Sequence, residues 1–140
     1  HNRDHTRPLI IATDSDNRVL NSARSNAERA GVSDLISFRR SDFRDALPPD
    51  GAEGGTIVTN PPYGQRLEVA DLEELYRAIG TWLKHNFTGW DAWILSGNPE
   101  GSKAIGLRTT SKHRVFNGGL ESRLLHIPVF GTSEASRTDA

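Results

Sequence analysis

The 140-residue chain contains no cysteine, no methionine and no long apolar run. Without thiols, disulfide bonds, thiolate zinc sites and cysteine nucleophiles are excluded. No apolar run approaches the ~20 residues that cross a bilayer, and the polar start HNRDHTRP lacks the apolar core of a signal peptide. These absences favour a soluble, cytoplasmic protein without a membrane partner. Because the chain starts at His1 and has no Met, we expect a fragment or a processed product.

The charge is also without a strong bias. Lys and Arg number 17 and Asp and Glu 18, for a formal net charge of -1, so no global positive field indicates a nucleic-acid-binding protein. The five histidines show neither the spacing of a metal site nor that of a catalytic triad, and we expect packing or surface roles for them and no bound metal. Length and a 35% hydrophobic fraction fit one globular domain.

The pattern of apolar residues predicts strands that alternate with helices. Asp16 is a good N-cap and Gly31 a good C-terminal residue for one helix, and Asp71 with Glu74 predicts the start of a second that ends near 86–89. Short apolar runs predict four strands, at 9–14, 35–39, 56–59 and 93–95. The apolar faces of the two helices are predicted to comprise Val19, Ala23, Ala27 and Ala30, and Leu72, Leu75, Ile79, Trp82 and Leu83.

This alternation predicts the fold class α/β, with a Rossmann-like parallel sheet and helices on both faces. Residues 112–116 and 123–130 flank the turn sequence NGGLE and predict a C-terminal antiparallel hairpin. We expect one domain over 1–130 and a polar linker or disordered tail over 131–140. In sheets of this kind ligands bind at the carboxyl ends of the strands, so the residues that follow each strand are the candidate site.

Acidic residues follow the first two predicted strands. Asp14 can accept two hydrogen bonds from the hydroxyls of a ribose, although it could instead end the strand and cap the helix, as we favour for Asp16. A metal-binding Asp-x-Asp pair lacks further ligands nearby in sequence. Asp42 and Phe43 could hold the amino-bearing edge of a base and cover its face, but a surface Asp after a strand is the commoner structure.

The third strand stops abruptly in the stretch IVTNPPYGQRL, because two prolines remove two backbone donors and fix two φ angles. An exocyclic amine of a nucleobase is a poor nucleophile, and an enzyme that alkylates it must accept its N–H bonds. The Asn60 side chain and the Pro61 carbonyl supply two acceptors, Pro62 helps to fix their direction, and Tyr63 can stack on the base. A simple Pro-Pro turn between strand and helix is the alternative.

With Asp14, Asp42 and NPPY at successive strand ends, the chain resembles the S-adenosylmethionine-dependent methyltransferases that act on exocyclic amines. The segments ATDSDNRVLNSARSNAERAGVSDLISF, TNPPYGQRL, LKHNFTGWDAWILSGNPE and FNGGLESRLLHIPVF narrow this resemblance. They are similar to the first catalytic domain of the bacterial large-subunit ribosomal RNA methyltransferases that modify guanine N2. The resemblance covers nearly the whole chain, from about Leu9 to Phe130, and implies that residues 1–130 are a partial methyltransferase catalytic domain.

The resemblance implies a cofactor site and a base site that meet at the strand ends. S-adenosyl-L-methionine would be the cofactor and large-subunit (23S) ribosomal RNA the partner. Asp14 would bind the cofactor ribose, Ser15 would lie near its adenine, and Asp42 would face the adenine amino group with Phe43 beside it. The residues implied to hold the target amine and substrate are Asn60, Pro61, Pro62, Tyr63 and Arg66, with Asn60 also next to the cofactor.

The chain also departs from the family pattern. The Gly-rich loop that follows the family's first strand has no counterpart in the sequence and would precede His1, as would that central strand and an RNA-binding module. We therefore expect unpaired strand edges and a fragment that is impaired as an enzyme on its own. A second methyltransferase domain would follow the tail.

Two other functions stay open at this point. The NPPY tetrapeptide is shared with adenine-N6 methyltransferases of DNA and RNA and does not by itself identify the base. A non-catalytic RNA-binding or scaffold fragment would also account for the missing cofactor loop.

Overall fold

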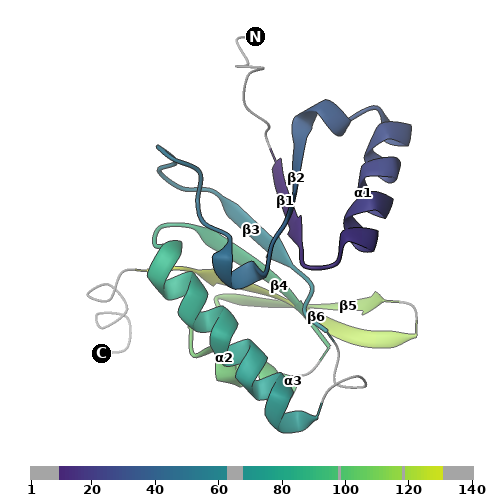
Figure 1. The fold of residues 1–140 in the computed structure, drawn as a ribbon. Helices are drawn as coiled ribbons and strands as arrows, with labels where there is room; N and C mark the ends of the chain where they lie inside the picture. The colour runs from purple at the N-terminus through teal and green to yellow at the C-terminus, as the bar shows by residue number, and fades with distance from the viewer. Residues whose placement is uncertain (1–9, 63–67, 98, 118, 131–140) are drawn as a thin grey trace. The chain divides into compact units, whose positions relative to one another are not determined.

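The computed structural model describes residues 10–62, 68–97, 99–117 and 119–130 (Figure 1). The chain divides into two compact units, His1–Ala46 and Leu47–Ala140. Each unit has its own sheet, one of two strands and one of four. The expected tail over 131–140 lies outside the described residues.

The first unit is a strand–helix–strand arrangement with a parallel two-stranded sheet (Figure 1). Asp16 begins the helix by accepting a hydrogen bond from the Arg18 amide, and Gly31 ends it at a φ of 74°, as the sequence predicted. The elements are β1 (Ile10–Asp14), α1 (Asn17–Ala30), η1 (Ser33–Leu35), β2 (Ile36–Arg40) and η2 (Phe43–Asp45).

Two details of this unit correct the sequence-based expectation. Leu35 closes the 3-10 turn η1, so β2 begins one residue later than predicted. The buried face of α1 is centred on Leu20 and Ala27, whereas Val19 is 49% exposed. The guanidinium of Arg24 lies over the ring of Phe38, with its carbon 5.7 Å from the ring centroid, and joins α1 to β2.

The second unit is a mixed four-stranded sheet in the order β3-β4-β6-β5. β3 runs parallel to β4, and β6 runs antiparallel to both β4 and β5. The hairpin is therefore confirmed and contributes one central strand and one edge strand. The elements are β3 (Thr56–Thr59), α2 (Val69–Asn86), β4 (Asp91–Ser96), α3 (Pro99–Ser102), η3 (Lys103–Ile105), β5 (Ser111–Asn117) and β6 (Leu120–Pro128).

The core of this unit lies between α2 and one face of the sheet. Tyr76 on α2, which the predicted apolar stripe did not include, is fully buried, and Leu75 is only half-buried. The helix also begins earlier than predicted, at Val69, after Glu68, whose side chain makes no capping hydrogen bond. The buried residues of this core include Leu72, Tyr76, Ile79, Leu83, Ala92, Ile94, Leu125 and Ile127.

Gly80 allows α2 to approach the segment that follows β4. A Cβ at this position would lie 1.8 Å from the carbonyl oxygen of Ile105, which ends η3. Ile105 itself is 3% exposed. Because Gly80 has no side chain, α2 can pack directly against η3, next to the carboxyl end of β4.

Both sheets have an unpaired edge. Among the described residues, β1 forms its ladder with β2 and β3 forms its ladder with β4, and neither has a second neighbour. Val58 in β3 is 75% exposed. No helix in the described part of the chain is both long and apolar enough to cross a membrane.

Candidate functional site

The carboxyl ends of β1 and β2 bring the predicted cofactor residues of the first unit together. Asp14 pairs with Arg40 in the parallel register, and the Ser41 amide donates a hydrogen bond of 3.0 Å to the Asp14 carbonyl. The Arg40 side chain donates from Nε to the carbonyl of Ser15, at 3.2 Å. Asp42 follows directly, so the Asp14–Ser15 and Asp42–Phe43 pairs lie at the same edge of the sheet.

Asp14 has one carboxylate oxygen in use. Its Oδ1 accepts a hydrogen bond of 2.8 Å from the amide of Asp16, which holds the side chain at the turn between β1 and α1. Within the described residues no hydrogen bond reaches Oδ2. A carboxylate that is held by one oxygen and partly exposed can accept a hydroxyl with the other, which is what a ribose requires.

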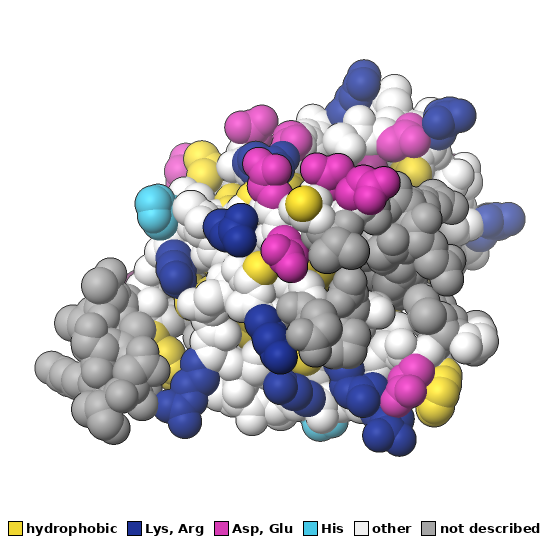
Figure 2. Space-filling view, turned by 90° about the horizontal axis from the view of Figure 1, so that it is seen from below, with side chains coloured by type: hydrophobic (Ala, Val, Ile, Leu, Met, Phe, Trp, Pro, Cys, Tyr) yellow, Lys and Arg dark blue, Asp and Glu magenta, His cyan; other side chains and the backbone are white. Residues whose placement is uncertain are grey.

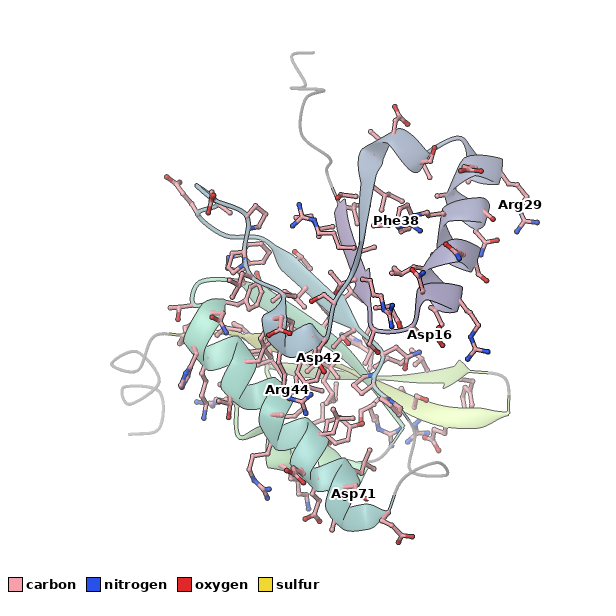
Figure 3. All side chains as sticks on the ribbon, in the orientation of Figure 1. Asp16, Arg29, Phe38, Asp42, Arg44 and Asp71 are labelled. Carbon is pink, nitrogen blue, oxygen red and sulfur yellow. The ribbon has the colours of Figure 1, made fainter. Side chains whose placement is uncertain are left out.

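The Asp42 carboxylate is occupied by its neighbour. Oδ1 accepts from the Arg44 amide at 2.9 Å, and Arg44 Nη1 lies 3.2 Å from both carboxylate oxygens (Figure 3). The same guanidinium lies over the Phe43 ring, 4.8 Å from its centroid. An exposed ion pair of this kind is worth about 0–1 kcal/mol, so an amino group of a base could replace Arg44 at little cost.

Asn60 and the two prolines lie at the carboxyl end of β3 in the second unit. Thr59 pairs with Ile94, and β4 continues to Ser96, so the prolines follow where the β3 ladder ends. Asn60 is exposed, Pro61 is buried and Pro62 is exposed. A buried proline with a fixed φ holds the carbonyl that precedes and the one that follows it in defined directions. Tyr63 and Arg66 fall outside the described residues.

A buried hydrogen bond supports this edge and was missed by sequence reasoning. The hydroxyls of Tyr76 on α2 and Ser96 at the end of β4 lie 3.1 Å apart, and both residues are buried. Twenty residues separate them in the chain, so no local pattern indicates the pairing. This hydrogen bond ties the end of β4 to α2 beside Asn60 and Pro61.

The comparison with known proteins identifies the family. Residues 1–126 match the family described as RMKL-like, methyltransferase domain. The chain belongs to this family. Its fold is accordingly an α/β methyltransferase fold, with the mixed sheet described above.

Relatives of this RMKL-like domain include two proteins named ribosomal RNA large subunit methyltransferase K/L. The protein from Syntrophotalea carbinolica is 42% identical over 125 residues, which are 87% of the chain and 18% of the relative. The protein from Legionella pneumophila strain Philadelphia 1 is 40% identical over 130 residues, 92% of the chain and 18% of the relative. The chain thus spans about a fifth of the length of these relatives.

Solved structures share the fold of the RMKL-like domain. The structure of SMU.472 complexed with SAH matches with a TM-score of 0.77 and 26% sequence identity. The matched region is 88% of the present chain and 32% of the SMU.472 chain. The "predicted N6-adenine-specific DNA methylase" from Listeria monocytogenes matches with a TM-score of 0.71 and 32% sequence identity. The matched region is 91% of the present chain and 32% of the Listeria chain. The names of both proteins describe methyl transfer, which agrees with the family match.

Proposed function

We propose that this RMKL-like domain transfers a methyl group from S-adenosyl-L-methionine to the exocyclic N2 of a guanine in large-subunit ribosomal RNA. The observation that carries the proposal is the end of β3, where an exposed Asn60 precedes a buried Pro61. The names of the two K/L relatives support ribosomal RNA as the substrate. Because the chain spans about a fifth of the length of these relatives, the proposed activity is that of the full-length protein.

The cofactor half of the reaction fits the first unit. The free carboxylate oxygen of Asp14 would accept a ribose hydroxyl, and Ser15 would lie near the adenine. Asp42 would accept from the adenine amino group in place of Arg44, with the Phe43 ring beside it. When bound, S-adenosylmethionine supplies an electrophilic methyl group.

The substrate half depends on the end of β3. The Asn60 side-chain oxygen and the Pro61 carbonyl would each accept an N–H of the guanine amine, which turns its lone pair toward the methyl carbon. Methyl transfer would form the N–C bond as the C–S bond breaks with its electron pair left on sulfur, and N2 would then lose a proton. Tyr63 would stack on the base, and Arg66 would contact the substrate.

The target guanine has to be unpaired or flipped out of its helix. An exocyclic amine inside a base pair is not accessible for in-line attack, and enzymes that modify bases pay a few kcal/mol to extrude them. Single-stranded loops of RNA lower that cost.

Replacing Asn60 by Ala tests the proposal in the protein as its gene encodes it. The change removes one acceptor of the amine, and we expect at least a ~100-fold loss of turnover with unchanged affinity for S-adenosylmethionine. Asn60→Asp keeps an oxygen acceptor and should retain part of the activity, and Asn26→Ala on the exposed face of α1 serves as the control. The readouts are methyl incorporation into unmodified ribosomal RNA and calorimetry with the cofactor. A fully active Asn60→Ala variant would reduce NPPY to a turn.

Adenine-N6 methylation of DNA or RNA is the second candidate. It is favoured by the similarity to the Listeria monocytogenes protein, which is described as a predicted N6-adenine-specific DNA methylase. Nucleoside analysis after reaction with ribosomal RNA and with DNA separates the two bases. If DNA adenine alone is methylated, the guanine-N2 proposal fails.

A further inference from the structure

The β5–β6 hairpin carries a group of arginine and aromatic side chains on one face. Directly paired residues in an antiparallel ladder lie on the same face, and so do residues two apart on one strand. The register pairs Arg114 with Arg123 and Phe116 with Glu121. The group, called the hairpin patch, comprises Lys112, Arg114, Phe116, Glu121 and Arg123.

One carboxylate fixes two guanidinium groups in the hairpin patch. Glu121 Oε1 lies 2.7 Å from Arg114 Nε and 2.8 Å from Arg123 Nη1. The hydrogen bond from Arg123, together with the charge of Arg114, lowers the pKa of Glu121. Within the described residues no hydrogen bond engages either Nη atom of Arg114, and the side chain is 65% exposed, so both Nη atoms can donate to another anion.

The patch carries more positive than negative charge. Three cations share a face with one carboxylate, in a chain whose formal net charge is -1. Lys and Arg side chains stand next to one another along the lower edge of the surface in Figure 2. Guanidinium forks match phosphate oxygens better than any other side chain, so the charge suits a phosphate backbone.

Phe116 adds a surface for stacking to the same face. Its side chain is 71% exposed, beside the fixed arginines and across the ladder from Glu121. A single exposed Phe is ordinary on a protein surface. Next to arginines, however, an exposed ring is the arrangement with which proteins bind unpaired bases, since the ring stacks on a base while cations contact the adjoining phosphates.

The hairpin extends past the end of the sheet at which Asn60 lies. β6 pairs with β4 only from Arg123 to Pro128, and Arg123 pairs with Ser96, the last residue of β4. Phe116 and Glu121 therefore lie beyond the carboxyl end of β4 (Figure 1). β3 runs parallel to β4, so Asn60 lies at that same end. Both features belong to the second unit.

We propose that the hairpin patch binds an unpaired stretch of the substrate RNA that flanks the target nucleotide. Phe116 stacks on one base, Arg114 and Lys112 contact phosphates, and Glu121 with Arg123 holds Arg114 in place. The inference rests on the proposed function for the choice of RNA as partner. In this inference the patch binds the flanking nucleotides, and the base to be methylated binds separately at Asn60.

Binding of a short single-stranded oligoribonucleotide to the purified protein tests the patch without any methyl transfer. Stacking predicts a ~10-fold weaker affinity for Phe116→Ala, with Phe116→Tyr close to wild type. Arg114→Ala removes a phosphate contact and should lower the affinity for the oligoribonucleotide. The slope of log K for binding against log salt concentration should become less negative by ~0.7, the value for one contact with a single strand. Arg77→Ala, an exposed arginine on α2, is the matched control.

The outcomes separate this inference from the proposed function. If Phe116→Ala and Arg114→Ala both bind the single strand like wild type, or if Arg77→Ala weakens binding as much, the patch is overturned even when methylation of ribosomal RNA is observed. If wild type methylates no RNA yet both variants weaken binding to the single strand, the patch stands and the methylation proposal fails. Equal losses toward duplex RNA would contradict stacking on an unpaired base. Thermal unfolding of each variant verifies that folding is intact.

Discussion

Three aspartates at the edge of the first unit show how much the role of a residue depends on its immediate contacts. Asp16 caps α1 through the Arg18 amide, Asp14 keeps one carboxylate oxygen for a further donor, and Asp42 caps η2 while paired with Arg44. The sequence placed all three after strands and correctly assigned the cap to Asp16. It could not find the Arg44 pair, because that contact depends on the turn that Asp42 itself begins.

The Glu121 carboxyl should titrate below the ordinary value of 4.5, because the charged form accepts hydrogen bonds from arginine. Its contribution to stability is present above that ordinary pKa and is lost as the pH falls through the lowered one. Arg123→Ala should raise the pKa toward 4.5 and Arg114→Ala should raise it less, as measured by NMR titration of the side chain. The titration should be unchanged in Arg77→Ala. A Glu121 pKa at 4.5 in wild type would mean that the two ion pairs do not persist in solution.

At the scale of elements, periodicity predicted the strands well and helix α2 less well. β3 lies where the sequence places it, because β-branched runs bounded by turn residues have few other conformations. The hairpin forms as predicted, but β6 begins three residues earlier than expected, at Leu120 inside the predicted NGGLE turn, and ends at Pro128. The predicted N-cap of α2, Asp71, lies three residues after the observed one, Glu68. The capping box of Asp71 and Glu74 therefore does not set the start of the helix, whose backbone hydrogen bonds begin with that from the Leu72 amide to the Glu68 carbonyl. Tyr76 was missed because its burial depends on a partner, Ser96, from β4.

Gly80→Ala should destabilise the protein although alanine is the better helix former. Alanine gains about 1 kcal/mol over glycine inside a helix, but here its Cβ would meet the Ile105 carbonyl at 1.8 Å. Moving η3 away costs packing, and we expect a net loss of about 1–3 kcal/mol, measured by denaturant unfolding. Ala78→Gly, at the half-buried position two residues earlier, should cost about 1 kcal/mol from helix propensity. A stabilised Gly80→Ala variant would show that α2 and η3 are not in close contact.

At the scale of the molecule, the buried residues are divided unequally between the two units. In the described part of the chain, Leu20 and Ala27 are the buried hydrophobic residues of the first unit, and all the others belong to the second. A two-stranded sheet with one helix has little apolar area to bury and is marginal by itself. The second unit has a central β4–β6 pair and a long covering helix, which is an adequate core.

Native-state hydrogen exchange should therefore show two levels of protection. Amides of the β4–β6 ladder, such as that of Ile94, should exchange only through the largest opening of the protein, and those of the β1–β2 ladder through a less costly local opening. Exchange measured by mass spectrometry on peptides from each strand gives both values. Equal protection of the two ladders would mean that they open as one cooperative unit.

The sequence by itself determined the strands, the caps of α1, the hairpin and the position of NPPY, because each depends on local backbone preferences or on a period of apolar residues. Only the tertiary structure decided that Tyr76 hydrogen-bonds Ser96 and that Gly80 admits the Ile105 carbonyl. It also decided that Arg114 and Arg123 lie level with the end of β4, with Phe116 beyond that end on the same face. These contacts join residues distant in the chain, and strand register and helix packing bring them together. The stretch at Asn60 shows both, since its prolines end a strand by local geometry, whereas its position next to the end of β4 comes from the parallel register of β3 and β4.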